Sequence, residues 1–413
     1  MSKIVINGPC QLTGKYKVQG AKNSVLPILS ASILSRGECI IKNCPDIIDV
    51  HNTLKILNHL GCKTKFEDST IIVNSECINT NEIPENLMRK MRSSIIFLGS
   101  LIARTGRAKM SYPGGCELGA RPIDMHLSSL QQLGISIKNI HGNLECNIID
   151  KLVGTNIILP FPSVGATENI LLAASIAEGI TTIENASCEP EIVDLSSFLN
   201  KMGAKIYDAG SSKITIEGVK KFHATEHKII PDRIVAITEM AGTAATGGHL
   251  LLENISQNLI GSTIPIFEES GCIIRSTSNS IEIIAPEKLH AVKEITTMPY
   301  PGFPTDAQPI IMAMLTKALG TSVFIENIFE NRFKHIDELI KLGANIQVKG
   351  NVSIVNGTNN LSGAKIRAYD LRGAASLLIA GLISCGKTTI EGGDFFLRGY
   401  DLKMFPKIFE FIN

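Results

Sequence analysis

Leu199-Asn200-Lys201-Met202-Gly203-Ala204-Lys205-Ile206 takes the chain out of an apolar, helix-like segment and into a strand through a single glycine. The same passage recurs four more times, and the spacings between the central glycines are 73, 69, 68 and 72 residues: Gly61, Gly134, Gly203, Gly271 and Gly343. Self-similarity at a fixed period is the mark of a repeat architecture. The spacing predicts six copies of one α/β unit, the sixth ending near residue 413.

The third copy shows the expected content of a unit most clearly. Residues 166–177 are rich in small apolar residues and predict a helix, residues 181–183 predict a strand, and residues 192–202 predict a second, amphipathic helix. Two strands follow the glycine. We therefore predict six βαβαββ-like units in an α/β protein.

The six units are expected to form two lobes of three. Residues 22–230 would hold units one to three, and residues 1–21 plus 231–413 would hold units four to six. The sixth copy ends without the strand pair that follows each earlier glycine, whereas residues 4–15 resemble residues 353–365. We expect the N-terminal segment to complete the last unit. An open solenoid used only for binding is the alternative, but closure of the chain ends favours two compact lobes.

Composition excludes several classes of protein. With 413 residues, 44% of them hydrophobic and 19% charged, the chain is expected to be globular and to form two or three domains. A formal net charge of +1 argues against a nucleic-acid partner. The longest apolar run, near residues 95–103, is too short to span a membrane, and the first residues lack signal-peptide features, so we expect a cytoplasmic protein. Ten scattered cysteines without a Cys-x-x-Cys pair indicate neither a disulfide framework nor a metal site.

Basic residues stand where the helix dipole disfavours them. The first helices of units one, two and six are expected to begin at Lys22, Arg92 and Arg372, although cations are unfavourable at a helix N-terminus. An anion bound between them would reverse this penalty. The alternative is three solvated side chains at frayed helix ends. A second set of arginines precedes the second helices: Arg121, Arg332 and Arg398.

Unit five has an acid at the equivalent place. Asp306, in the run Thr305-Asp306-Ala307-Gln308-Pro309, fits a helix cap, and Pro309 in the first turn supports that interpretation. A carboxylate placed among cations could instead act as the general base for a hydroxyl group.

Unit two carries a longer loop, residues 112–122, with three glycines within six positions. Its Cys116 is close in sequence to Arg121, which favours an exposed and reactive thiol over a buried one. Loops that close over a site and exclude water have this character. An ordinary glycine-rich turn with an incidental cysteine is the alternative.

Taken together, these segments resemble the enolpyruvyl transferases over nearly the whole chain, and within them the members that act on UDP-N-acetylglucosamine. The resemblance rests on nine motifs: residues 20–23, 91–94, 113–122, 163–167, 231–233, 303–306, 330–333, 370–372 and 398–400. It implies an inside-out α/β barrel fold with two lobes of three units. It also implies transfer of the enolpyruvyl group of phosphoenolpyruvate to the 3-hydroxyl of UDP-N-acetylglucosamine, with no cofactor, as the first committed step of peptidoglycan synthesis.

The resemblance further implies a role for each matched residue. Cys116 would be the general acid, a site of adduct formation with phosphoenolpyruvate and the target of fosfomycin, and Asp306 would take the proton of the sugar hydroxyl. The phosphate would be held by Lys22, Arg121 and Arg398, and the carboxylate by Arg332 and Arg372. The nucleotide sugar would be bound by Asn23, Arg92, Arg121, Pro122, Ile123, Asp124, Met125, Ser163, Val164, Gly165 and Ile328.

Two positions depart from the pattern, and three alternative functions stay open. Some family members carry lysines where this chain has Ile48 and Phe161, which affects nucleotide or loop contacts and not the chemistry. The acceptor could be shikimate 3-phosphate or another uridine nucleotide. A catalytically inactive paralogue that binds the nucleotide sugar is the third alternative.

Overall fold

The structure is a computed structural model that describes residues 2–114, 123–402, 404–405 and 408–412. This part of the chain divides into two compact units, residues 20–114 with 123–230, and residues 2–19 with 231–412. The sequence interpretation had placed the first chain crossing two residues later, at residue 22. Each unit has its own hydrophobic core.

The first unit contains three four-stranded sheets, each built in the order edge strand, parallel neighbour, then two antiparallel strands. The sheets are β14-β3-β5-β4, β6-β7-β9-β8 and β10-β11-β13-β12. The strands are β3 Glu38–Lys42, β4 Lys63–Glu67, β5 Thr70–Asn74, β6 Glu82–Ile83, β7 Arg107–Ser111, β8 Ile135–Ile140, β9 Asn143–Ile148, β10 Asn156–Ile158, β11 Ile180–Glu184, β12 Lys205–Tyr207, β13 Lys213–Glu217 and β14 Glu226–Lys228. The helices are α1 Lys22–Ala31, α2 Ile48–His59, α3 Glu85–Met88, α4 Phe97–Thr105, α5 Asp124–Gln132, α6 Val164–Ala174 and α7 Pro190–Lys201, with short 3-10 turns η1 Ser32–Leu34 and η2 Arg92–Ile96.

The second unit repeats the plan with sheets β22-β23-β1-β24, β16-β17-β15-β2 and β18-β19-β21-β20. Its strands are β1 Lys3–Gly8, β2 Thr13–Lys17, β15 His249–Glu253, β16 Ile273–Ser276, β17 Ser280–Ile284, β18 Glu294–Thr296, β19 Thr321–Ile325, β20 Asn345–Lys349, β21 Val352–Asn356, β22 Lys365–Arg367, β23 Gly386–Glu391 and β24 Phe409–Ile412. Its helices are α8 Arg233–Ala245, α9 Ile264–Glu269, α10 Gln308–Leu315, α11 Ile336–Lys341 and α12 Leu371–Ile383, with turns η3 Gln257–Leu259, η4 Arg332–His335 and η5 Gly393–Arg398.

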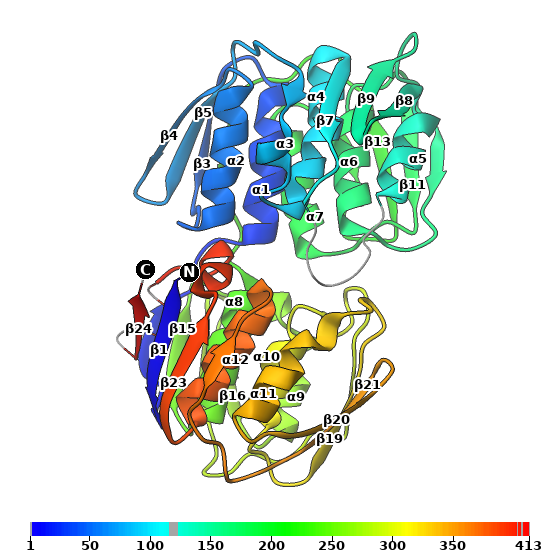
Figure 1. Ribbon diagram of the computed structural model, residues 1–413. Helices are drawn as coiled ribbons and strands as arrows, with labels where there is room; N and C mark the ends of the chain where they lie inside the picture. Colours follow the sequence, from blue (N-terminus) through cyan, green and yellow to red (C-terminus); the bar gives the residue numbers. More distant parts are fainter. Residues whose placement is uncertain (1, 115–122, 403, 406–407, 413) are drawn as a thin grey trace. The chain divides into compact units, whose positions relative to one another are not determined.

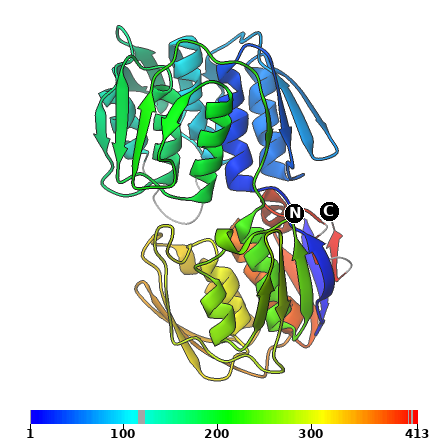
Figure 2. The same cartoon turned by 180° about the vertical axis from the view of Figure 1, so that it is seen from behind.

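Helices lie on the inside of each unit and sheets on the outside (Figures 1 and 2). The three first helices of the second unit, α8, α10 and α12, contact one another, and nearly every residue in them is buried. A helix surrounded by protein must be apolar on all faces, which explains their small and aliphatic sequences. The predicted order of elements within a unit is confirmed, for example by β10, α6, β11, α7, β12 and β13 in succession.

The repeated glycines have a common backbone conformation. Gly61, Gly134, Gly203, Gly271 and Gly343 follow the second helix of units one to five, and their φ angles lie between +96° and +105°. Side chains strongly disfavour this region, whereas glycine enters it freely. The sequence repeat is therefore a repeat of left-handed helix ends.

The N-terminal strands serve two different sheets. β1 pairs antiparallel with β23 on one side and with β24 on the other, whereas β2 pairs parallel with β15 of unit four. The expectation that the last unit lacks both of its final strands was wrong, because β24 at the C-terminal end supplies one of them. In this sheet β1 lies between β23 and β24, so the N-terminal segment supplies one strand of the last unit.

Candidate active site

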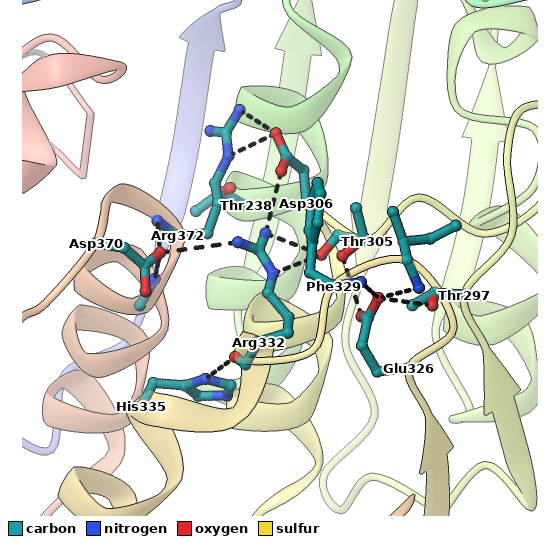
Figure 3. A network of polar contacts seen from close by, with 12 residues as sticks. Thr238, Thr297, Thr305, Asp306, Glu326, Phe329, Arg332, His335, Asp370 and Arg372 are labelled. Carbon is teal, nitrogen blue, oxygen red and sulfur yellow. Dashed lines mark hydrogen bonds and ion pairs between the residues drawn. The ribbon is translucent and has the colours of Figure 1, made fainter. Parts of the chain in front are cut away.

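Asp306 of the second unit lies between two buried arginines (Figure 3). Arg372 donates from Nε and Nη2 to Oδ2 at 3.1 and 2.9 Å, and Arg332 donates from Nη2 to Oδ1 at 3.1 Å. The arginine side chains are 1% and 3% exposed, whereas that of Asp306 is 29% exposed. Two buried cations are thus covered by one partly accessible carboxylate.

Asp306 is not a helix cap. The N-cap residue of α10 is Ala307, and no side chain hydrogen-bonds the helix start. Pro309 occupies the first turn as expected. The capping alternative is therefore wrong, and the position of Asp306 is explained by its arginine partners.

Asp370 resolves the unfavourable position of Arg372 at the start of α12. Its carboxylate accepts from the backbone N–H groups of Arg372 at 2.9 Å and Gly373 at 3.0 Å, which caps the helix. The same carboxylate lies 3.8 Å from Nη1 of Arg332. An acid one residue before the helix therefore offsets the dipole and one of the arginine charges.

Tyr400 holds the far end of the Arg372 guanidinium. Nη1 of Arg372 donates to the phenolic oxygen at 2.9 Å, and Oγ1 of Thr238 lies 3.1 Å from that oxygen. The ring is fully buried and stacks on Phe396 with 4.7 Å between centroids. Burial opposes the charge of Arg372, but Tyr400, Asp306 and Asp232 outweigh it and raise the pKa of the guanidinium. Arg372 is thus fixed in both charge and direction.

The side chain of Arg332 is oriented by the backbone of Thr305. Its Nε and Nη2 donate to the carbonyl oxygen of Thr305 at 3.1 and 2.9 Å. Nδ1 of His335 donates to the carbonyl oxygen of Arg332 at 3.1 Å, and burial lowers the pKa of His335 to about 4. A neutral His335 adds no positive charge behind the two arginines.

Glu326 organises the loop that carries Ile328. One carboxylate oxygen accepts from Oγ1 of Thr297 and the backbone N–H groups of Ile328 and Phe329, while the other accepts from Oγ1 of Thr305. Glu326 is 4% exposed. The sequence reasoning missed Glu326, His335 and Tyr400, because no local pattern marks them and Tyr400 reaches Arg372 and Thr238 only through the fold.

In the first unit, Lys22 begins α1 and its Nζ lies 2.7 Å from Oδ2 of Asp49, in the first turn of α2. Both side chains are buried. Asn23, the next residue, is exposed. Lys22 is therefore not one of the solvated cations of the alternative interpretation, because a buried carboxylate holds it at the start of α1.

Asn169 of α6 is hydrogen-bonded to η2, α4 and α5. Its Oδ1 accepts from the N–H of Gly99 at 2.7 Å, and its Nδ2 donates to the carbonyl oxygen of Ile95 at 3.2 Å and to Nδ1 of His126 at 2.8 Å. Ser163 caps α6 by accepting from the N–H of Ala166 at 3.3 Å. Burial, together with the charge of Arg92, lowers the pKa of His126 to about 4. His126 and Asn169 were also missed from the sequence.

The predicted site residues fall into two groups. The first unit brings Lys22, Asn23, Arg92, Ile123, Asp124, Met125, Ser163, Val164 and Gly165 into its α1, η2, α5 and α6 starts. The second unit brings Asp306, Ile328, Arg332, Arg372 and Arg398 to the starts of α10 and α12 and the turns η4 and η5. Cys116, Arg121 and Pro122 lie outside the described residues. Convergence of the two groups on one substrate stays a prediction.

The two departures from the family pattern have simple surroundings. Ile48 is the first residue of α2, and Phe161 is 40% exposed with its carbonyl oxygen accepting from the N–H of Ser163 at 2.7 Å. Among the described residues, no cluster of three or more His, Cys, Asp or Glu side chains is arranged to hold a metal ion. No described helix is long and apolar enough to cross a membrane.

Comparison with solved structures defines the class of fold. An enolpyruvyl transferase, NikO from Streptomyces tendae, superposes with a TM-score of 0.90 at 23% identity over 100% of this chain and 99% of that chain. EPSP synthase from Acinetobacter baumannii gives 0.77 at 19% identity over 100% of both chains. The predicted enolpyruvyl transferase fold is confirmed.

Sequence comparison then gives the family. The family model described as EPSP synthase (3-phosphoshikimate 1-carboxyvinyltransferase) matches residues 6–407. The chain belongs to this family of enolpyruvyl transferases. It is 48% identical to UDP-N-acetylglucosamine 1-carboxyvinyltransferase 2 of Caldanaerobacter subterraneus subsp. tengcongensis over 97% of this chain and 96% of that protein. It is 45% identical to UDP-N-acetylglucosamine 1-carboxyvinyltransferase of Thermotoga maritima over 97% and 95%. These relatives confirm the resemblance seen in the sequence.

Proposed function

We propose that this protein transfers the enolpyruvyl group of phosphoenolpyruvate to the 3-hydroxyl of UDP-N-acetylglucosamine, with release of phosphate, in the cytoplasm. Relatives at 45–48% identity over nearly the full length bear the name of this activity. The reaction is the first committed step of peptidoglycan synthesis. Phosphoenolpyruvate and the nucleotide sugar are the only partners that the proposal requires.

The donor is a small anion that needs several cations. Lys22, Arg121 and Arg398 hold its phosphate, and Arg332 and Arg372 hold its carboxylate. A guanidinium binds a carboxylate through charge-assisted N–H donors, and Arg372 already presents Nε and Nη2 to one oxygen of Asp306. This contact supports the assignment because a substrate carboxylate would be bound in the same way.

Asp306 occupies the place of that carboxylate until the donor arrives. With guanidinium groups against both of its oxygens, Asp306 is stabilised as an anion and is a poor proton acceptor. When the donor's carboxylate takes over Arg332 and Arg372, Asp306 loses this stabilisation and becomes a better base. The exchange couples donor binding to activation of the base.

The chemistry is an addition followed by an elimination. Asp306 removes the proton of the sugar 3-hydroxyl while the oxygen of that hydroxyl attacks C2 of phosphoenolpyruvate. The thiol of Cys116 protonates C3, which becomes a methyl group. The product of this step is a tetrahedral ketal that still carries phosphate. Return of a proton from the methyl group to the thiolate of Cys116 and cleavage of the bond between C2 and the phosphate oxygen then give the enol ether and free phosphate. Fixed cations stabilise the charge that develops on the leaving phosphate.

The nucleotide sugar is bound mainly by the first unit. Asn23 and Arg92 contact the substrate, Arg121 to Met125 and Ser163 to Gly165 surround the uridine diphosphate, and Ile328 contributes from the second unit. The start of α6 supports this assignment, since N–H groups at a helix N-terminus bind anions.

The paired arginines around Asp306 are the observation that carries the proposal, and an acceptor panel tests it. The purified protein is mixed with phosphoenolpyruvate and, in separate reactions, with UDP-N-acetylglucosamine, another uridine nucleotide or shikimate 3-phosphate. We expect phosphate release with UDP-N-acetylglucosamine alone. Release with another acceptor would reassign the substrate, and release with none would indicate a binding protein.

A further inference from the structure

The side-chain amide of Gln19 holds the turn that follows Arg398. Nε2 of Gln19 donates to the carbonyl oxygen of Gly399 at 3.1 Å, and its Oε1 accepts from the backbone N–H of Asp401 at 3.1 Å. A carbonyl group only accepts and a backbone N–H only donates, so the amide fits in one orientation and both of its ends are used. One side chain therefore fixes the backbone of residues 399–401 at two points.

Gln19 is itself held in place by its neighbours. It is 8% exposed, and its carbonyl oxygen accepts from the N–H of Asp232, the residue that caps α8, at 2.8 Å. The preceding residue, Val18, donates its N–H to the carbonyl oxygen of Glu253 at 2.9 Å and accepts from Nδ2 of Asn254 at 2.9 Å. The amide therefore reaches the turn from a segment that is anchored to the start of α8 and the end of β15.

The turn carries the anion contacts of the second unit. Arg398 is the last residue of η5 and directly precedes Gly399. The hydroxyl of Tyr400, the next residue, accepts from Nη1 of Arg372 at 2.9 Å. Gly399 packs against the start of α12, since a Cβ atom at this position would lie 2.8 Å from Cδ2 of Leu371. A shift of the turn would therefore move Arg398 and the phenol that fixes Arg372 together.

We propose that Gln19 is a positioning residue for phosphoenolpyruvate, which directs Arg398 at the phosphate and keeps Tyr400 against Arg372 without touching the substrate. The inference rests on the proposed function, in which these two arginines hold the phosphate and the carboxylate of the donor. UDP-N-acetylglucosamine is bound mainly by the first unit in that function. Loss of the Gln19 amide should therefore affect one substrate and not the other.

Gln19→Met tests this role, because methionine has a similar length and volume but neither the donor nor the acceptor. We expect the KM for phosphoenolpyruvate to rise about tenfold and kcat to fall, since small misplacements of a binding group are costly. The Kd of UDP-N-acetylglucosamine, measured by titration calorimetry, should change by less than about twofold. A KM does not depend on the fraction of molecules that are folded, so the split separates positioning from loss of native protein. If Gln19→Met does not fold, Gln19→Ala, in which water can reach both backbone groups, is measured with the same expected split.

Gln11→Met is the matched control. Gln11 is an exposed residue of the same unit, and its Nε2 donates to the carbonyl oxygen of Gly247 at 2.6 Å. This variant also removes a hydrogen bond from a glutamine to a backbone carbonyl, but outside residues 398–401, and both constants should stay within about twofold of the wild type. An unchanged KM for phosphoenolpyruvate in Gln19→Met, equal losses for both substrates, or an equal rise in Gln11→Met would each overturn the assignment of Gln19 while the proposed function stands. Failure of the wild type to release phosphate with UDP-N-acetylglucosamine would overturn both.

Discussion

Arg372 donates two hydrogen bonds to a single oxygen of Asp306, at 3.1 Å from Nε and 2.9 Å from Nη2. The other oxygen of Asp306 accepts from Arg332. Because both guanidinium groups are buried and the carboxylate is partly exposed, anything that reaches these arginines must first compete with Asp306. In the proposed reaction the acid would thereby stand next to the incoming donor.

Replacement of Asp306 by asparagine tests its role as the base. The amide keeps the shape of the side chain but cannot accept the proton of the sugar hydroxyl, so we expect turnover to fall about 10²- to 10⁴-fold. The affinity for UDP-N-acetylglucosamine should change by less than about threefold, measured by titration calorimetry. Loss of nucleotide-sugar binding would instead show that Asp306 has a structural role.

Tyr400→Phe tests whether the phenol fixes Arg372. Oγ1 of Thr238 donates to the carbonyl oxygen of Ile234 at 2.7 Å, so the phenolic proton is the one shared with Thr238. Removing the hydroxyl leaves a buried donor on Arg372 unpaired, and we expect a loss of about 1–3 kcal/mol in the free energy of unfolding.

The control for this variant is Thr238→Val, which removes only the acceptor of the phenolic proton. In a double-mutant cycle, Thr238→Val should cost less in the Tyr400→Phe background than in the wild type. Equal costs in the two backgrounds would mean that Thr238 and Tyr400 are not coupled.

The sequence was most informative where one residue type is needed for one backbone conformation. Gly61 and Gly203 each end a helix with φ above +100°, so their recurrence revealed the repeat. Basic residues at Arg92 and Arg372 were recognised because they contradict the helix dipole. Both signals involve only residues that are adjacent in sequence, so they can be recognised without knowledge of the fold.

The partners of these residues could not be predicted in the same way. Asp49, Tyr400 and His126 reach their partners only through packing between elements, and nothing in their own neighbourhoods marks them. The sheets that the N-terminal strands join could not be predicted either. Similarity to residues 353–365 indicated that the segment completes a sheet, but did not show that β1 and β2 join different sheets.

Fosfomycin is expected to alkylate Cys116, and UDP-N-acetylglucosamine is expected to accelerate the reaction. Cys116 is close in sequence to Arg121, and a nearby cation favours the thiolate, the form that attacks an epoxide. Mass spectrometry of the digested protein should show the adduct on the Cys116 peptide. Cys77 and Cys385 are exposed and serve as internal controls for unspecific alkylation. An unmodified Cys116 peptide after saturating treatment would contradict the prediction.

The neutrality of His126 predicts a pH-dependent stability. Its pKa is lowered to about 4 by burial, with Arg92 acting in the same direction. The same side chain titrates near 6.5 in an unfolded chain. Between these values the unfolded chain binds a proton that the native protein does not, so the free energy of unfolding decreases as the pH falls from about 6.5 to about 4.

Glu239 acts in the opposite direction, because burial raises its pKa to about 8 and its stabilising contribution is lost as the pH rises through that value. The contribution of His126 must therefore be isolated by comparing the wild type with His126→Gln, which keeps Glu239. Between pH 7 and 4.5 we expect the wild type to lose about 2–3 kcal/mol more than the variant in urea unfolding. Stability curves that stay parallel over this range would mean that native His126 is protonated, and its Nδ1 could then no longer accept from Asn169.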